Sequence, residues 1–495
     1  MKHGKKDSNK DEKEKKEIVR LQFDRTKQTL KDFAPLIYSI ILFTTIFVIF
    51  YAYRTIYFEG LLPGSTPYYY LKSAEDIIKN RWLLSSSEKQ FSGYYYLLAL
   101  AKSESDRAVF WLPALLSVLS LIAIFFLMKE FGARSETIGI ALLILASSPA
   151  FLYQAMSLSA NLASLCLTLW GAYFYRKKSA PAKVVSAISF LAAALMTKEG
   201  LIISAVLVIA LGNEEKIKNA FLGLIALASL VYILPAFKFG WNILFTFKQK
   251  LSLSQIVLEL GGISGIGIIE AVVAFIGIIY SVSSKGENRN VVYGVLFLIV
   301  LLTLGFDIVA YAAVTAAILA AYAIQKLKER EWTLPMLKGA SLLLIMCGLV
   351  FATLTFTNII IKMGPSPLLI SSLREFAKSS YKGGIVLSSP ENGFYLEYVN
   401  IKTFVDETYS SKNKVNLANE IFYSRSLKYS RELLQNNSIA YILITPDMKN
   451  GSVWSREDQG LLFILRNKET FRRVELNQSE GIEVWEYLLN SSNLS

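Results

Sequence analysis

Several carboxylates stand near the ends of long apolar segments, where they could hold a divalent cation against a phosphate group. Glu75 and Asp76 follow the first apolar segment, Glu259 stands in a later polar stretch, and Glu199 and Asp307 separate neighbouring apolar segments. Carboxylate oxygens are good ligands for Mg²⁺ and Mn²⁺, and such a cation stabilises charge on a transferring group. Glu259, Glu75 and Asp76 are therefore our candidates for catalytic residues. The alternative is that Glu75 and Asp76 lie on a solvent-exposed face of a helix and have no catalytic role.

Histidine and cysteine chemistry has little support in the chain. Its one histidine, His3, stands in the charged N-terminal tail. Its two cysteines, Cys166 and Cys347, both fall inside apolar segments, where a thiol usually serves packing. The sequence therefore excludes histidine catalysis and the common metal sites built on histidine, and it offers no disulfide pattern.

The elements that would position these carboxylates are membrane-spanning helices. Only 18% of the 495 residues are charged and the mean hydropathy is +0.40, whereas a soluble domain carries about 25% charged residues. A span needs roughly 20 mostly apolar residues. We predict a multispan α-helical membrane protein with about 11 transmembrane helices, the shortest lying within 183–212. The candidate spans are 34–53, 109–128, 137–155, 158–175, 183–197, 200–212, 219–237, 264–283, 291–305, 307–325 and 338–361.

The charges of the connecting segments predict how the chain is oriented. Lysine and arginine gather in the N-terminal tail and in every second connection, a bias typical of the cytoplasmic side. We expect a basic cytoplasmic tail over 1–33, a transmembrane domain over 34–363 with outer loops at 54–108 and 238–263, and an extracytoplasmic domain over 364–495. The protein would then be a multi-pass integral protein of the plasma membrane.

Two further observations bear on this orientation and on partners. Every Asn-x-Ser/Thr triplet stands in 364–495, where it could accept a glycan only outside the cytoplasm, although chance in an Asn- and Ser-rich segment explains the pattern equally well. The net charge of +13 comes largely from the tail and the inner connections. Attraction to anionic lipid headgroups explains this charge better than nucleic-acid binding, so we expect membrane lipid as a partner and no nucleic acid.

The two outer loops carry aromatic and basic side chains suited to a membrane interface. A helix is predicted to begin near Tyr68, and Tyr68 and Tyr69 are candidates for contact with a lipid-linked ligand. Lys248 and Lys250 in the second loop, and Lys198 between two spans, are candidates for contact with its phosphate as point charges.

The segment 364–495 alternates strand and helix patterns. The stretches GGIVLSSP, KTFVDE, IAYILITPD and IEVWEYL predict strands, KVNLANEIFYSRSLKYSRELLQNN predicts one or two helices, and GLLFILRN predicts a short helix or strand. Strands that alternate with helices are typical of an α/β domain with a largely parallel sheet.

Four stretches resemble motifs of the GT-C membrane glycosyltransferases, especially the catalytic subunits of archaeal-type oligosaccharyltransferases. GSTPYYYLKSAEDI, from Gly64, is similar to the family's first-loop segment, and IVLE, from Ile256, is similar to its TIXE motif. FDIVAYAAVTAAILAAY, from Phe306, resembles a span that the family begins with an arginine. SPENGFYLEYVNIKTFVDET, from Ser389, stands where the family has its WWDYG motif. The resemblance covers nearly the whole chain.

Several positions depart from the family's pattern. The family's first-loop aspartate, a metal ligand, falls on Thr66, and its second acidic pair falls on a stretch that offers Asn161. Its span arginine falls near Asp307, and PENGF, which contains Glu391 and Asn392, replaces WWDYG. A hydroxyl and an amide bind Mg²⁺ or Mn²⁺ poorly compared with two carboxylates. The resemblance therefore implies a divalent metal cofactor only if other carboxylates take over.

Glu259 is the clearest survivor among the family's acidic residues, and by resemblance it would hold the metal or orient the acceptor. The resemblance implies transfer of a sugar or glycan from a polyprenyl-phosphate-linked donor to an extracytoplasmic acceptor, as in protein glycosylation. The alternative is a catalytically inactive relative that binds lipid-linked glycan or partners a true oligosaccharyltransferase. A transporter is a weaker third interpretation, because the sequence shows no internal repeat.

Overall fold

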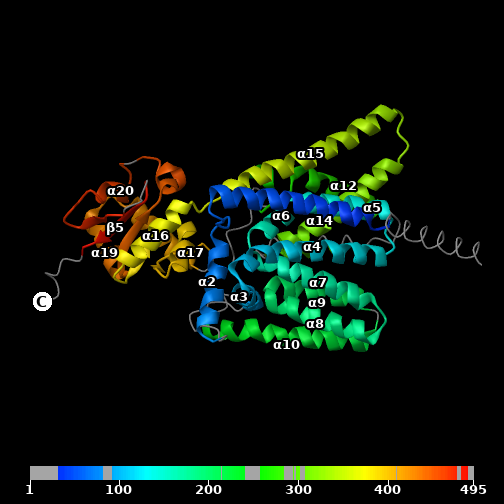
Figure 1. Cartoon of the computed structure of the whole chain (residues 1–495), viewed down its shortest axis with the longest axis horizontal. Helices are drawn as coiled ribbons and strands as arrows, with labels where there is room; N and C mark the ends of the chain where they lie inside the picture. The colour runs from blue at the N-terminus through cyan, green and yellow to red at the C-terminus, as the bar shows by residue number, and fades with distance from the viewer. Residues whose placement is uncertain are drawn as a thin grey trace, which may run out of the picture.

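The chain folds into a helical bundle with a smaller module of helices and strands at one end of its long axis (Figure 1). The predicted tail lies almost wholly outside the residues that the structure describes, and so do Lys248 and Lys250. In this computed structural model the described residues are 32–81, 92–212, 214–239, 257–262, 264–283, 294, 297–301, 307–407, 410–456, 458–476 and 481–488.

Among the described residues, five helical stretches are long and apolar enough to cross a membrane. A sixth span would consist of α5 (Ser135–Ser147) and α6 (Pro149–Met156), which meet at a bend of 55°. The five stretches are Asp32–Tyr57, Ala108–Glu130 in α4 (Asp106–Glu130), Glu215–Ile233 in α10 (Glu215–Phe239), α14 (Val309–Glu329) and Pro335–Ser379, which includes α15 (Pro335–Lys362).

Four other predicted spans form shorter helices. These are α7 (Ala160–Arg176), α8 (Ala180–Met196), α9 (Lys198–Leu211) and α12 (Ile268–Ser283). None of the four reaches the roughly 20 residues that a straight span needs. The predicted span at 291–305 lies mostly outside the described residues. The structure thus has a multispan helical architecture, and the number of eleven spans stays a prediction.

The bend between α5 and α6 interrupts a segment that the hydropathy pattern predicts as one span. Ser148 adopts an extended backbone (φ −64°, ψ 124°), and Pro149 begins α6. A proline disfavours helical backbone in the residue before it and cannot donate the hydrogen bond that would continue the helix. The apolar composition of the segment hides this break.

Glycines allow bundle helices to approach closely. On α7, a Cβ atom at Gly171 would lie 2.9 Å from the Phe190 ring of α8, and the Ser186 hydroxyl donates to the Gly171 carbonyl at 2.8 Å. On α12, a Cβ atom at Gly277 would collide with the carbonyl oxygen of Leu319 on α14. Small residues at contact points and interhelical hydrogen bonds are what stabilises helix packing in a membrane.

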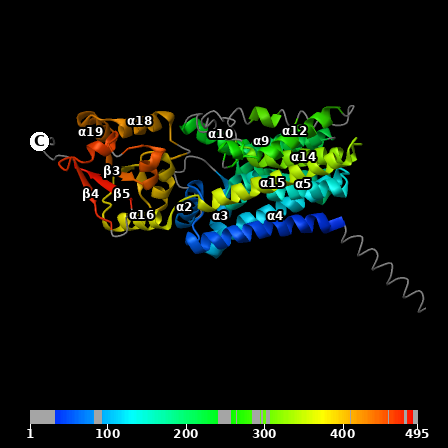
Figure 2. The same cartoon turned by 90° about the horizontal axis from the view of Figure 1, so that it is seen from above.

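Two helices of the first predicted outer loop lie between the bundle and the module (Figures 1 and 2). Helix α2 (Thr66–Lys79) begins with a proline in its first turn, where the fixed φ angle of proline suits a helix start. Helix α3 (Gly93–Glu104) follows Ser92, whose hydroxyl accepts from the Tyr94 amide as an N-cap. The helix predicted near Tyr68 is confirmed, and it starts two residues earlier.

The module is built on one five-stranded sheet with the order β2-β1-β3-β5-β4. The strand β1 pairs in parallel with β2 and β3, and β5 pairs antiparallel with β3 and β4, so the sheet is mixed where we expected a largely parallel one. The strands are β1 (Ile385–Leu387), β2 (Lys402–Thr403), β3 (Ile439–Ile444), β4 (Phe471–Val474) and β5 (Glu483–Tyr487).

Helices cover both faces of this sheet, and one of them faces α2. Tyr68 of α2 packs edge-on against Tyr395 and Tyr398 of α17, with ring centroids 5.2 and 5.1 Å apart. This aromatic contact belongs to a buried cluster that α2, α3 and the module share. The helices of the module are α16 (Pro367–Ser379), α17 (Gly393–Tyr398), α18 (Lys412–Tyr423), α19 (Leu427–Asn436) and α20 (Leu461–Ile464).

Candidate functional site at the junction of bundle and module

Two acidic residues, Glu199 and Asp307, lie within electrostatic range of each other at the end of the bundle that faces the module. Glu199 lies in the first turn of α9 and is only 6% exposed, and its Oε1 accepts a hydrogen bond from the backbone amide of Asp307 at 3.4 Å. Asp307 is half-buried and lies just before α14. We call Glu199 and Asp307 the carboxylate pair. Burial of a carboxylate such as that of Glu199 costs free energy, so a buried acid with a second acid beside it is often functional.

The local sequence explains why α9 starts where it does. The Thr197 hydroxyl accepts from the Gly200 amide at 2.9 Å and caps the helix. A Cβ atom at Gly200 would collide with the hydroxyl of Ser164 and with the carbonyl of Ala193, so only glycine lets α9 approach α7 and α8 this closely. This packing places Glu199 at the end of the bundle.

Two tyrosines connect the pair to the other elements at the junction. Burial raises the pKa of Tyr70 in α2 above its ordinary value, and the nearby carboxylates of Asp307 and Glu199 raise it further. Tyr153 of α6 lies within electrostatic range of Asp307 and of Glu407, which follows strand β2 in the module. The carboxylate pair is therefore within electrostatic range of α2, and Asp307 is also within range of Tyr153 in α6, which in turn is within range of the module.

The module also reaches the start of α2 directly. The Ser65 hydroxyl donates to Oε2 of Glu407, and the Gly64 amide donates to the Gly364 carbonyl at 2.7 Å. The half-buried Thr66, which stands where the resemblance places a metal-binding aspartate, is the first residue of α2. The first predicted outer loop and the module thus contribute to one junction.

Asn161, the second neutral position, lies in the first turn of α7 and is 8% exposed. Its Oδ1 has no hydrogen-bond partner among the described residues. A buried amide oxygen without a partner loses free energy unless a ligand or water supplies a donor. The structure thus leaves the hydrogen-bonding capacity of this buried oxygen unused among the described residues.

The structure places the predicted catalytic Glu259 in the 3-10 helix η2 (Leu258–Leu260). Its Oε2 accepts from the Ile268 amide at 2.8 Å, so the side chain caps the first turn of α12. The carboxylate also lies near the buried Glu270, to which the Ser148 hydroxyl donates at 2.8 Å. Most of the second predicted outer loop is outside the described residues, and no described contact joins Glu259 to Glu199 or Asp307.

Glu75 and Asp76 are held by lysines on the side of α2 toward the module. Lys102 pairs with Glu75, and Lys72 binds Asp76 at 2.7 Å and also donates to Asn400 at 2.7 Å. The described contacts do not bring these two carboxylates to the carboxylate pair. Their arrangement stabilises α2 against α3 and against the module.

The predicted donor-contacting tyrosines form part of the buried junction. Tyr68 is 2% exposed and Tyr69 is 9% exposed, and the ring centroid of Tyr69 lies 5.1 Å from that of Phe394 in α17. Lys198, in contrast, is half-buried and lies beside Glu199, within electrostatic range of that carboxylate. Of the predicted donor contacts that are described, Lys198 is the one next to the carboxylate pair.

In the stretch that replaces WWDYG, Asn392 is buried and Glu391 is exposed. The Asn392 amide donates to the hydroxyls of Ser388 and Ser389 at 3.0 Å each, inside the module. Glu391 is exposed, yet partial desolvation by the surrounding protein raises the pKa of its carboxyl group, and the carboxylates of Glu407 and Asp447 raise that pKa further. Glu391 therefore extends the acidic surface around Glu407.

Tyr70, Tyr153, Ser65 and Glu407 were missed as candidates from the sequence. The signal for Glu407 is the acidic turn in KTFVDET, which the resemblance covers without assigning a role. The signal for Tyr70 is the tyrosine triplet, of which we selected the first two residues. Nothing in the sequence pattern distinguishes Tyr153 from other tyrosines in apolar segments.

The described residues hold no group of three or more histidine, cysteine, aspartate or glutamate side chains placed to bind a metal ion. Two carboxylates are nevertheless the usual protein contribution to Mg²⁺ when substrate phosphates and water supply the other oxygens. Glu199 and Asp307 are close enough to interact electrostatically, which is the observation that agrees with this limited role, whereas Thr66 and Asn161 carry only neutral oxygens.

Comparison with known proteins identifies the fold. The sequence matches no protein-family model, and no curated protein matches it. The structure is similar to the Archaeoglobus fulgidus oligosaccharyltransferase in the apo form, with a TM-score of 0.62, 13% identity, and coverage of 91% of this chain and 75% of that chain. The same protein in complex with an inhibitory peptide and a dolichol-phosphate gives a TM-score of 0.60, 12% identity, and coverage of 94% and 75%.

A third similar structure is ArnT from Cupriavidus metallidurans bound to undecaprenyl phosphate, with a TM-score of 0.52, 12% identity, and coverage of 91% of this chain and 98% of that chain. Together with the apolar helices, these similarities define an integral, multi-pass membrane protein with the GT-C glycosyltransferase fold. Within that class, the chain has a fold like that of the archaeal oligosaccharyltransferase.

Proposed function

We propose that this protein is a membrane glycosyltransferase that transfers a sugar or glycan from a polyprenyl-phosphate-linked donor to an acceptor outside the cytoplasm. The observation that carries the proposal is the carboxylate pair, which lies at the junction of bundle and module in a GT-C fold. The dolichol-phosphate and undecaprenyl phosphate in two of the similar structures support a lipid phosphate on the donor, and the inhibitory peptide supports a polypeptide acceptor.

Asp307 is the proposed base in this reaction. Its side chain is half-buried, whereas Glu199 beside it is almost fully buried, so Asp307 is the more accessible of the two acids. The acceptor N–H or O–H gives its proton to Asp307 as the acceptor atom forms a bond to the anomeric carbon of the sugar. The bond from that carbon to the phosphate oxygen breaks, and the lipid phosphate leaves with the electron pair.

Charges near the pair would stabilise the leaving phosphate. Lys198 supplies a cation beside Glu199, and Lys248 and Lys250 are proposed to add two more. A divalent cation bound by Glu199 and Asp307 would neutralise charge on the phosphate oxygens. Glu199 also accepts the hydrogen bond from the Asp307 amide and so fixes the position of that residue.

The proposal is tested by incubating the purified protein with radiolabelled polyprenyl-linked sugars and an acceptor peptide. We expect a labelled glycopeptide, and less product with EDTA than with Mn²⁺. Equal product with EDTA and with Mn²⁺ would remove the cation from the proposal and leave base catalysis by Asp307. An absence of product with every donor, despite correct folding, would overturn the proposed transfer.

The alternative is an inactive relative that binds lipid-linked glycan or partners a true oligosaccharyltransferase. The neutral residues at Thr66 and Asn161 favour it, because they remove two acidic positions that the resemblance would require. This alternative predicts donor binding without transfer. Measurement of donor binding in the same preparation therefore separates the two functions.

The other acidic candidates from the sequence are tested in the same assay. Glu259→Gln keeps an oxygen that can accept from the Ile268 amide but removes the negative charge at the start of α12 and near Glu270. Glu75→Gln and Asp76→Asn remove the ion pairs on α2. A catalytic role requires loss of transfer with an unchanged melting temperature, whereas a structural role requires that both fall together.

A further inference from the structure

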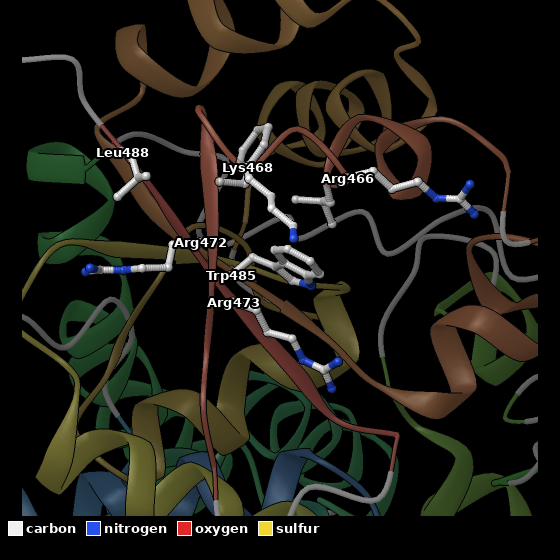
Figure 3. A pocket seen from close by; sticks show the side chains of 8 residues that line it. Arg466, Lys468, Arg472, Arg473, Trp485 and Leu488 are labelled. Carbon is white, nitrogen blue, oxygen red and sulfur yellow. The ribbon is translucent and has the colours of Figure 1, made fainter.

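Residues of strands β4 and β5 line a cavity (Figure 3). Both strands lie at the end of the molecule opposite the bundle (Figure 2). The volume of the cavity is about 510 Å³. Its floor includes the indole ring of Trp485 together with Phe471 and Leu488. The Trp485 Nε1 donates to Oε2 of Glu483 at 3.0 Å, which fixes the orientation of the ring. The cavity therefore offers a fixed aromatic surface.

Four cationic side chains and no acidic one line this cavity. Two of them are partly neutralised by carboxylates of β5. Arg472 donates from Nε to Glu486 at 3.0 Å, and Figure 3 shows it pointing away from the other three cations. The Arg473 guanidinium lies 3.8 Å from Oε1 of Glu483. Lys449 binds that same oxygen more closely, at 2.7 Å. Much of the charge of Arg473 is therefore available to a ligand.

Arg466 and Lys468 complete the set from the turn between α20 and β4. Both are exposed, and no ion pair joins either of them to an acid within the described part of the chain. The neighbouring Glu469 is exposed and does not line the cavity. The cavity thus combines an aromatic floor with a rim of uncompensated positive charge.

Strand β4 lies at the edge of the sheet, and among the described residues it pairs only with β5. An edge strand presents unpaired backbone N–H and C=O groups, to which an extended peptide can add as a further strand. Alternate side chains of such a peptide point to the same face of the sheet. They would therefore reach the cavity over Trp485 and its cationic rim.

We infer that this surface binds an acidic, extended segment of a partner polypeptide, which pairs with β4 and places its carboxylates on Arg466, Lys468 and Arg473. Guanidinium groups match carboxylates in charge and geometry. A lipid headgroup is a poor occupant, because β4 and β5 lie at the end of the molecule opposite the bundle in both views (Figures 1 and 2). The inference does not depend on glycosyl transfer.

The test measures binding of a fluorescent, end-blocked peptide that alternates glutamate with valine to the full-length protein in neutral detergent, by anisotropy. The two comparison ligands are the same peptide with lysine in place of glutamate and an oligogalacturonate of similar charge. The double variant Arg466→Glu/Lys468→Glu, called the rim variant, reverses the charge of two cationic side chains at the cavity. The double variant Arg425→Glu/Lys428→Glu changes the net charge equally at exposed positions elsewhere on the module. Trp485→Ala removes the aromatic floor.

We expect the glutamate peptide to bind at least tenfold more tightly than the lysine peptide. We expect the rim variant and Trp485→Ala to weaken binding about tenfold or more, and the matched control less than threefold. Equal effects of the rim variant and its control would overturn the inference, as would preferential binding of the oligogalacturonate. A glutamate peptide with proline in place of each valine loses half of its backbone N–H donors and pairs poorly as a strand, so it should bind at least fivefold more weakly.

Discussion

At the scale of single residues, a side-chain hydrogen bond from Ser65 to Glu407 joins the start of α2 to the module. The two residues are 342 positions apart in the sequence. Glu407 also acts electrostatically on Tyr153, a neighbour of Asp307. The module and Asp307 are therefore both within electrostatic range of Tyr153.

The first prediction concerns this contact. Ser65→Ala and Glu407→Ala should each lower the free energy of unfolding. A hydrogen bond to a charged group typically contributes about 1.5–3 kcal/mol, and solvent weakens this one because Glu407 is exposed. A double-mutant cycle should therefore give a coupling free energy of about 1 kcal/mol. Thermal unfolding in detergent measures it. Strict additivity of the two substitutions would contradict the contact.

The second prediction concerns Glu391 and pH. Its pKa is raised in the folded protein, so the folded state holds the proton more strongly than the unfolded state does. Glu391 therefore contributes its full stabilising free energy below the ordinary pKa of glutamate. That contribution is lost as the pH rises through the pKa that Glu391 has in the folded protein. Glu391→Gln should therefore raise the melting temperature by about 1 °C at pH 7 and leave it unchanged well below about pH 4.

Thermal melts at the two pH values check this, with Glu469→Gln, an exposed glutamate elsewhere on the module, as the control. A melting temperature that falls at pH 7 would show that the charge of Glu391 stabilises the module. In that case the acidic surface around Glu407 would have a partner cation that the described contacts lack.

Single residues also show what the sequence could and could not predict of the site. Glu199 and Asp307 were recognised as acids between apolar segments, because a carboxylate there is costly. Their contact was not predictable, since it depends on how α9 packs beside the start of α14. The ion pairs of Glu75 and Asp76 were equally hidden, because Lys102 comes from another helix and Asn400 from the module.

At the scale of elements, close packing of α12 on α14 depends on Gly277. Gly277→Ala should lower the free energy of unfolding by about 1–3 kcal/mol, because the methyl group would collide with the Leu319 carbonyl. Gly223→Ala, in α10, is the matched control, since a Cβ atom there meets nothing within 4 Å. The control should be neutral or stabilising by about 0.5–1 kcal/mol from helix propensity.

Chemical or thermal unfolding of both variants in the same detergent decides this prediction. Equal destabilisation by the two substitutions would mean that the helices do not meet at Gly277. The comparison is internal, because both glycines lie in apolar helices and both lose the same conformational freedom.

The elements themselves were largely predictable, and the exceptions have physical causes. Ten of the eleven predicted apolar segments coincide with described helices, because the apolar runs are long and carry few charges. The break at Ser148 was hidden by its apolar surroundings. The strand β4 was missed because FRRV carries two arginines, and both of their side chains are exposed to solvent on this edge strand.

At the scale of the whole molecule, the orientation in the membrane stays a prediction from the charge bias of the connections. In a background without the two native cysteines, Ser411→Cys in the module should react with a membrane-impermeant maleimide on intact cells. Glu331→Cys, between α14 and α15, should react only after the cells are opened. Both positions are exposed in the structure. The reverse pattern would place the module inside the cell.

The whole account depends on the carboxylate pair lying where donor and acceptor meet. The direct measurement is single-turnover glycosyl transfer by Asp307→Asn, with Glu331→Gln, an exposed acid outside the junction, as the matched control. Loss of a general base typically costs about 10²–10⁴-fold in rate. We predict a loss in that range for Asp307→Asn, with donor binding unchanged and the control at the wild-type rate. Wild-type transfer by Asp307→Asn in a correctly folded protein would contradict the account.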